Sequence, residues 1–252
     1  MTDKLARRAE LAGLNASAPP QEANVEGWLI RLSPGKAKRS RCVNALAAGS
    51  LPLPDLITRC RHTFAAAGLP LIIRITPYSQ PSDLDQRLAD LGWFEFDSTQ
   101  VLIRPSLDGL PHGPALRHVH AAHYARIVGE LRGSSPHAIA AHAERMHHAT
   151  VEYQGYVLEG AQGELLCCGQ IVVEDGIVGL YDIFTPPERR GQGHAQSLCE
   201  ALLRTARSQG ATEAYLQVST DNHAARRLYA RLGFHFGYHY HYRSDDKAAT
   251  ES

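Results

Sequence analysis

The sequence has no surplus of either charge, no long apolar run and few cysteines. Its 252 residues include 26 Lys and Arg and 26 Asp and Glu, so no overall field attracts a polyanion, and we expect no nucleic acid partner. No stretch approaches the roughly 18 uninterrupted apolar residues that cross a bilayer, so we expect no membrane span. The charged N-terminal segment MTDKLARRAELAGLN lacks the apolar region of a secretion signal. These absences together favour a cytoplasmic location.

The spacing of the candidate ligands disfavours a metal site. The cysteines are odd in number, fit no metal spacing and are expected to be reduced thiols; they stand at positions 42, 60, 167, 168 and 199. Histidines crowd the stretch from 118 to 148, but no two stand four residues apart as a helical ligand pair would. Glu144 and His148 have that spacing, yet two ligands do not make a site. We also expect no carboxylate beside the histidines that share a face of the last strand: His235, His239 and His241.

Apolar periodicity indicates two halves in which helices and strands alternate. Strands such as LPLIIRIT and EAYLQVS follow helices such as DLITRCRHTFAAAG, which predicts an α/β fold with a mixed sheet. Gly and Pro mark a linker between the halves. We expect a weakly ordered N-terminus at residues 1–22, a first domain at 23–105, the linker at 106–114, a second domain at 115–243 and a tail at 244–252.

The two halves also form a degenerate internal repeat. Both run helix, strand, turn, helix, Leu-Gly-aromatic and strand. Aligning Leu91-Gly92-Trp93 with Leu232-Gly233-Phe234 brings the helices into register without gaps. The alternative stays open that any two segments with this order of elements would align as well.

The segment RRGQGHA, residues 189–195, stands directly before the amphipathic helix QSLCEALLRTARSQG. A helix N-terminus presents unpaired N–H groups and partial positive charge, and small residues let a phosphate approach them. Arginine adds a charged donor fork. The segment therefore predicts a pyrophosphate site, although a glycine turn between a strand and a helix is also common without any ligand.

Residues 115–243 resemble the GNAT superfamily of acetyl-CoA-dependent N-acetyltransferases. The family signature Arg/Gln-x-x-Gly-x-Gly/Ala is met by Arg190, Gly193 and Ala195, and the strand ending at Thr185-Pro186 also fits. The later Asn…Tyr…Gly-Phe run extends the match. The resemblance is to two-part GNAT proteins, and it implies a tandem architecture with a degenerate N-terminal half and a complete C-terminal acetyltransferase domain.

The repeat shows what the first half has lost. In the aligned register, Gly191 to Ala195 fall opposite SLPLP, residues 50–54, and the two prolines there cannot donate to a phosphate. Asn222 falls opposite Pro81, and Tyr229 opposite Leu88. We therefore expect the first half to be a packing or substrate-shaping partner, and not a second active site.

The resemblance implies roles for particular residues. The strand before the loop would bind the acetyl carbonyl and the pantetheine through Ile183, Phe184 and Thr185. Tyr229 stands where the family has its general acid, although a core tyrosine is the alternative; Asn222 would contact the pantetheine or cap the last helix. The pyrophosphate would lie on Arg190, Gly191, Gln192, Gly193, His194 and Ala195.

The group that receives the amine proton is less certain from the sequence. Asp182 could attract the amine or relay its proton through water, although strand alternation places it opposite Ile183 and it could equally be a solvated carboxylate. Glu152 and Tyr181 are weaker alternatives.

The resemblance implies an N-acetyltransferase that uses acetyl-CoA as cosubstrate and acts by direct attack on a primary amine of a small molecule, amino acid or peptide. The alternatives are a non-catalytic acetyl-CoA sensor or scaffold, and a protein N-terminal or lysine acetyltransferase. Neutral net charge, the aromatic last strand and Asp182 hint at a small cationic amine. The sequence leaves a homodimer open.

Overall fold

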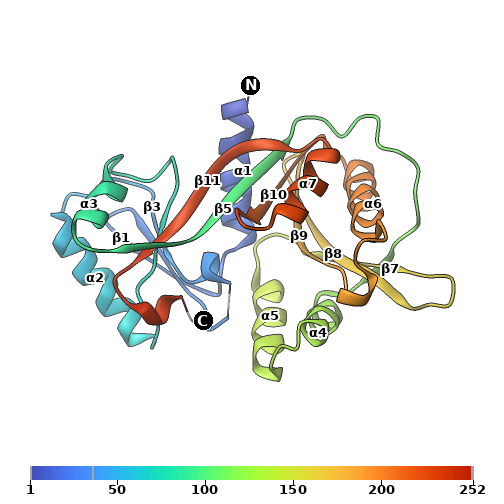
Figure 1. Ribbon diagram of the computed structural model, residues 1–252. Coiled ribbons are helices and arrows are strands. Elements are labelled where there is room, and N and C mark those ends of the chain that lie inside the picture. The colour runs from blue at the N-terminus through green and yellow to red at the C-terminus, as the bar shows by residue number, and fades with distance from the viewer. Residues whose placement is uncertain (1, 36, 251–252) are drawn as a thin grey trace. The chain divides into compact units, whose positions relative to one another are not determined.

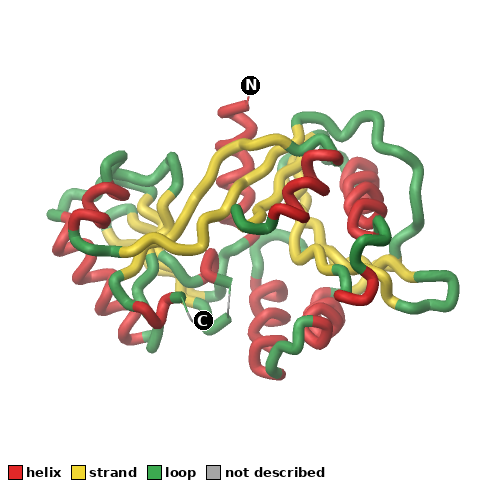
Figure 2. Tube along the Cα trace, viewed as in Figure 1, coloured by secondary structure: helices red, strands yellow, loops and turns green. Residues whose placement is uncertain are grey.

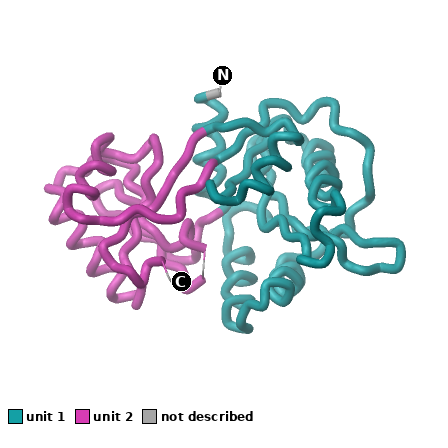
Figure 3. Tube along the Cα trace, in the orientation of Figure 1, with its two compact units in different colours: residues 1–16, 101–237 teal, residues 17–100, 238–252 magenta. Residues whose placement is uncertain are grey.

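A computed structural model describes residues 2–35 and 37–250 and divides the chain into two compact units (Figures 1 and 3). Unit 1 comprises residues 1–16 and 101–237, and unit 2 comprises residues 17–100 and 238–252. The division falls inside two long strands, β5 (Phe94–Arg104) and β11 (His235–Ser244), which each give residues to both units. The units are therefore not the consecutive domains expected from the sequence, because periodicity marks a strand but not where the strand passes from one unit to the next.

Unit 1 alternates helices and strands around one sheet (Figure 2). Besides its parts of β5 and β11, it contains α1 (Thr2–Ala16), β6 (Arg117–Val119), α4 (Ala121–Leu131), α5 (Pro136–His148), β7 (Gln154–Glu159), β8 (Leu165–Glu174), β9 (Ile177–Phe184), the 3₁₀ turn η2 (Pro187–Arg189), α6 (His194–Ser208), β10 (Glu213–Ser219) and α7 (His223–Arg231). The strand order is β5-β10-β9-β8-β7-β6. The pair β9 and β10 is parallel, and the pairs from β9 to β6 are antiparallel.

Helices cover both faces of this sheet. On one face α6 packs into the main core, where Leu198 and Leu202 meet Cys167 and Leu180. On the other face α4 supplies Tyr124 and Val128, which form a core with residues such as Cys168 and Phe184. Consecutive residues Cys167 and Cys168 thus enter different cores, as the two-residue repeat of a strand requires.

The N-terminal segment expected to be weakly ordered forms α1. Its buried residues recur at helical spacing and are mostly small: Leu5, Ala6, Ala9, Ala12 and Ala16. Alanine contributes little to a hydrophobicity pattern, so periodicity indicates this closely packed face only weakly. Arg8 donates to the Asp175 carbonyl at 2.7 Å and pairs with Glu213, and Asn15 donates to Glu174 at 2.6 Å. These contacts hold α1 on unit 1.

Unit 2 repeats the order of elements seen in unit 1. It contains β1 (Gln21–Val25), β2 (Trp28–Leu32), η1 (Lys38–Ser40), β3 (Val43–Ala45), α2 (Leu53–Ala66), β4 (Ile73–Ile75), α3 (Leu84–Asp90) and η3 (Lys247–Ala249), with the strand order β1-β2-β3-β4-β11. The series β3-α2-β4-α3 corresponds to β9-α6-β10-α7, and in both series the two strands are parallel neighbours. This agrees with the predicted internal repeat.

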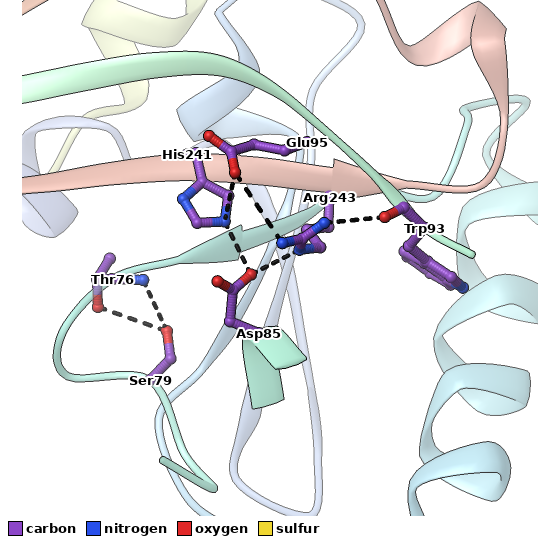
Figure 4. A network of polar contacts seen from close by, with 7 residues as sticks. All are labelled: Thr76, Ser79, Asp85, Trp93, Glu95, His241 and Arg243. Atoms are coloured by element: carbon purple, nitrogen blue, oxygen red, sulfur yellow. Dashed lines mark hydrogen bonds and ion pairs between the residues drawn. The ribbon is translucent and has the colours of Figure 1, made fainter. Parts of the chain in front are cut away.

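The last strand of unit 2 carries a charged network that the sequence did not indicate (Figure 4). His241 is 7% exposed and lies 2.9 Å from the Asp85 carboxylate of α3, with Glu95 of β5 at 3.9 Å. Arg243 donates to Asp85 at 2.5 Å and to the Trp93 carbonyl at 2.9 Å. The expectation of no carboxylate beside these histidines was therefore wrong for His241, because both carboxylates come from other elements of the fold.

None of the helices within residues 2–35 and 37–250 combines the length and the apolarity needed to cross a membrane.

Candidate active site

Strands β9 and β10 separate at their carboxyl ends. Their parallel pairing runs from Ile177–Glu213 to Leu180–Leu216 and ends there, although β9 continues to Phe184 and β10 to Ser219. Parallel strands normally hydrogen-bond along their whole shared length. The end of β9 therefore presents backbone groups to the space between the strands, at the position where the sequence predicts the acetyl carbonyl to bind.

A β-bulge lies in β9 at the same place. Tyr181 pairs with Gln170 and Phe184 with Cys168, so Asp182 and Ile183 both stand opposite Gly169. Asp182 has a φ of 49°, in the left-handed region that aspartate tolerates better than most residues. Such a bulge bends the strand and redirects its side chains. It directs β9 away from β10 beyond Leu180.

The bulge is held on both faces of the sheet. The buried Tyr124 hydroxyl donates to the Asp182 carbonyl at 3.0 Å, on the α4 side. Ile183 packs on the other side into the core with α6, and Gly169 leaves room for it, since a Cβ there would stand 2.5 Å from Ile183. Asp182 and Ile183 thus point to opposite faces, as strand alternation predicted.

The turn before α6 has the features of an anion-binding backbone. The helix begins at His194, and its N-cap, Gly193, has a φ of 84° and no capping side chain. Gly191 also has a positive φ, of 75°, and a Cβ built on either glycine meets no atom within 4 Å. The backbone therefore has room beside both glycines, and it leads into a helix N-terminus, which attracts negative charge. In unit 2 the corresponding helix α2 has Pro52 and Pro54 at its start.

The polar side chains of this turn are partly occupied by local contacts. Arg190 donates through Nε to the Thr185 carbonyl at 3.2 Å, and among the described residues its Nη groups have no hydrogen-bond partner, so they remain for an anion. Gln192 donates to the Glu188 carbonyl at 3.2 Å, and its amide oxygen lies 3.2 Å from the His194 ring. The ring of His194 is therefore turned to Gln192, and the backbone of His194 is the part that faces an incoming ligand.

Tyr229 and Asn222 lie on and before α7. The Asn222 side chain accepts from the Ala225 N–H at 3.1 Å, so it caps α7, which was one of the two alternatives. Tyr229 is 8% exposed and packs edge-on against Phe234. Burial raises the pKa of the Tyr229 hydroxyl, and the nearby Cys199 and Cys167 thiols raise it further. Tyr229 therefore stays protonated and can donate a proton but not accept one.

Cys167 lies in the same core as Tyr229 and contacts Thr185, which follows the end of β9. Its Sγ lies 3.0 Å from the Thr185 hydroxyl, and burial raises the pKa of the Cys167 thiol to about 11. A thiolate in these surroundings is a stronger base than in water, since burial disfavours its charge. The structure thus places the proposed acid, Tyr229, and the proposed acetyl-binding residue, Thr185, around one thiol.

The Asp182 carboxylate is engaged in ion pairs. Arg132, the C-cap of α4, lies 3.1 Å from Oδ1, and His142 of α5 lies 3.1 Å from Oδ2. Burial favours a raised pKa for Asp182, but the hydrogen bond from His142 and the charges of Arg132, His142 and Arg145 outweigh it and hold the pKa far below its usual range. A carboxylate of such low basicity does not accept a proton from an amine. Its geometry favours an electrostatic and positioning role over a proton relay.

Tyr181 and Glu152 are the other two residues that the sequence suggests as the proton acceptor. The Tyr181 hydroxyl hydrogen-bonds to the Tyr215 hydroxyl and is buried on the face opposite α6, while Glu152 is exposed before β7. Within residues 2–35 and 37–250 no three His, Cys, Asp or Glu side chains gather as metal ligands.

Replacing Asp182 with asparagine tests the ion pairs by their pH dependence. Because folding lowers the pKa of Asp182, its stabilisation is complete above its unfolded pKa of about 3.9 and is lost as the pH falls below that value. We expect Asp182→Asn to lower the free energy of unfolding by about 1.5–3 kcal/mol at pH 7. Urea titrations at pH 7, 5 and 3.5 should show the difference from the unaltered protein shrinking only at the lowest pH; a constant difference would contradict the assignment.

Comparison with known proteins identifies this arrangement. Residues 122–234 match the acetyltransferase (GNAT) family. An uncharacterized N-acetyltransferase of Bacillus subtilis, YobR, is 27% identical over 232 residues, which are 88% of this chain and 91% of the relative. A tandem GNAT protein from the clavulanic acid biosynthesis pathway is 17% identical, with a TM-score of 0.57 over 96% of this chain and 92% of its own. Residues 122–234 therefore match a GNAT acetyltransferase domain, and the whole chain has the fold of two-part GNAT proteins.

The GNAT fold extends over both units. A GCN5-related N-acetyltransferase from Kribbella flavida superposes with a TM-score of 0.70 at 18% identity, covering 96% of this chain and 95% of that one. The similarity therefore includes the proline-bearing unit 2 as well as the unit that carries the glycine turn. This confirms the predicted tandem architecture, with a mixed sheet and helices on its faces.

Sequence reasoning missed several residues around the bulge of this acetyltransferase. Tyr124, Arg132 and His142 come from α4 and α5, and Cys167 from β8. They are 15 or more residues from Asp182 along the chain, so no local spacing connects them to it. His142 lies in the histidine-rich stretch, whose spacing bears on metal binding and does not indicate a pair with Asp182. A buried tyrosine on an otherwise aliphatic helix face was the one available signal, and it is weak.

Proposed function

We propose that this GNAT protein transfers an acetyl group from acetyl-CoA directly to a primary amine of a small molecule, an amino acid or a peptide. The observation that carries the proposal is the end of the β9–β10 pairing at Leu180–Leu216, directly beside the bulge at Asp182 and followed by the uncapped start of α6. An exposed strand end can hold a thioester carbonyl, and the helix start can hold the diphosphate. The end of β9 and the start of α6 follow one another along the chain, so one extended molecule such as acetyl-CoA can contact both.

The residues of the turn fit the diphosphate of acetyl-CoA. Gly191 and Gly193 have positive φ values, which other residues rarely adopt, and in the described residues no atom lies within 4 Å of a Cβ built on either, so the backbone there has room for a bound diphosphate. Gln192, His194 and Ala195 would add backbone N–H groups, and Arg190 its free Nη groups. Ile183, Phe184 and Thr185 would hold the acetyl carbonyl and pantetheine, and Asn222, besides capping α7, would contact the pantetheine.

The chemistry then needs one proton donor from the protein. The amine nitrogen forms a bond to the carbonyl carbon, and the carbon–sulfur bond breaks. Backbone N–H groups at the bulge stabilise the negative charge on the carbonyl oxygen. Tyr229 gives its proton to the leaving thiolate and recovers one from solvent, while the amine loses its proton to water.

Two measurements on the full chain test the proposal. Calorimetric titration with acetyl-CoA should show binding, and thiol release in the presence of a panel of primary amines should show turnover. A protein that binds acetyl-CoA but releases no thiol with any amine would support the sensor or scaffold instead. A protein that does not bind acetyl-CoA would contradict both.

A further inference from the structure

The bulge of β9 faces a group of cations that exceeds the negative charge beside it. Arg132 and His142 both contact Asp182, and the charge of Arg145 also acts on that carboxylate. Arg145 donates to neutral oxygens, the Tyr153 hydroxyl at 3.0 Å and the Ala16 carbonyl at 3.4 Å, and in the described parts of the chain it contacts no carboxylate. Two arginine charges therefore act on one aspartate charge. A net positive charge remains beside the bulge even when His142 is neutral.

Arg132 is the member of this group that a substrate can reach. Its side chain is 39% exposed, and its guanidinium lies 5.4 Å from the centre of the Phe184 ring. Only Nη1 is engaged, by Asp182 at 3.1 Å; across residues 2–35 and 37–250 its other nitrogens have no protein partner. Asp182 thus fixes the orientation of a donor fork beside the proposed acetyl site while leaving most of its donors available.

The charge balance revises the hint about the acceptor. A cationic amine was suggested by Asp182, but the structure shows that carboxylate already paired with Arg132 and His142. Excess positive charge repels an ammonium group and lowers its pKa, so it favours the neutral amine that the reaction needs. The same charge attracts a carboxylate carried by the acceptor.

We propose that the acceptor is an amine with a carboxylate on the adjacent carbon, as in a free α-amino acid, and that Arg132, oriented by Asp182 and backed by Arg145, binds this carboxylate. The inference rests on the proposed acetyl transfer and names its substrate class. It also assigns Arg132 as a specificity-determining residue in contact with the substrate.

The test compares free amino acids with their carboxamides, which keep the amine and side chain but lack the negative charge. Thiol release is measured for each pair with the full-length protein, together with agmatine and spermidine as cationic amines. We expect kcat/KM to be about tenfold or more higher for the preferred amino acid than for its amide, because the amide loses one charge-assisted interaction.

Three variants separate substrate recognition from a structural role. Arg132→Gln should lower kcat/KM for the amino acid about 10- to 100-fold, mainly through KM, and bring the amino acid and amide to similar values. Arg132→Lys should restore part of the preference. Arg126→Gln, on the exposed face of the same helix, should behave as the unaltered protein. Acetyl-CoA binding by titration should be the same in all three variants.

Each outcome decides the inference. A preference for amides or for the cationic amines, or an equal loss for both members of a pair in Arg132→Gln, overturns it while leaving acetyl transfer to amines established. If acetyl-CoA binds but no amine is acetylated, or if acetyl-CoA does not bind, the proposed function fails and this inference fails with it.

Discussion

Replacing Tyr229 with phenylalanine is expected to slow acetyl transfer about a hundredfold while acetyl-CoA still binds. A general acid contributes roughly 10²- to 10⁴-fold to a rate, and the lower end applies to a thiolate that can leave without help. Burial and the thiols of Cys199 and Cys167 raise the pKa of Tyr229, so it is protonated at neutral pH and available to donate, but the same shift makes it a weaker acid than a tyrosine in water. Burial raises the pKa of Cys167 to about 11, so a thiolate leaving nearby would also be a stronger base than in water.

The measurement is kcat by thiol release, with acetyl-CoA affinity and thermal unfolding measured in parallel. Tyr240→Phe provides a matched control, since Tyr240 is a buried tyrosine of unit 2, outside the proposed site. An unchanged kcat in Tyr229→Phe would show that the tyrosine only packs against Phe234. Loss of acetyl-CoA binding together with kcat would indicate a positioning role instead.

Replacing Gly193 with valine is expected to weaken acetyl-CoA binding about a hundredfold. At a φ of 84° a β-branched residue is strained, and its side chain would fill the open space above the first N–H groups of α6. Each charge-assisted hydrogen bond that a diphosphate loses costs roughly 1.5–3 kcal/mol, and the side chain blocks more than one of them. Calorimetric titration with acetyl-CoA measures the effect.

The opposite end of the same helix supplies the control. Gly210 follows α6, has a φ of 94°, and also has no atom within 4 Å of a built Cβ. Gly210→Val therefore introduces the same kind of backbone strain, about 1–2 kcal/mol of folding stability, away from the proposed diphosphate site. If both variants lose acetyl-CoA affinity equally, the effect comes from strain, and the turn before α6 is not the binding site.

Features formed by residues close together in the chain could be predicted from local sequence patterns. The glycine turn before α6 was predicted because Gly191, Gly193 and Ala195 lie within one short segment. The repeat of β3-α2-β4-α3 and β9-α6-β10-α7 was predicted because both copies keep the same order and spacing. Asn222 was predicted to bind pantetheine or to cap a helix. The structure shows the cap, in which its side chain accepts from the N–H of Ala225, three positions later.

The features that escaped prediction depend on residues far apart in the chain. α1 was missed because its contacts are made by alanines, whose packing value depends on the surface they meet. The passage of β5 and β11 from one unit to the other leaves no mark on the alternation of either strand. His241 was expected beside no carboxylate, and Asp85 reaches it from 156 positions earlier.

The amino-acid sequence by itself indicated the resemblance to the GNAT family, the repeated order of helices and strands in the two halves, and the glycine turn before α6, because these depend on residue type and short-range spacing. Only the tertiary structure decided the net charge around Asp182, beside the proposed acetyl site. The charge of Asp182 is paired because Arg132 and His142 lie 3.1 Å from its carboxylate oxygens, and those distances arise from packing α4 and α5 on the sheet. A carboxylate that looked free in the sequence is thereby paired with cations, and our proposal assigns the remaining donors of Arg132 to the acceptor.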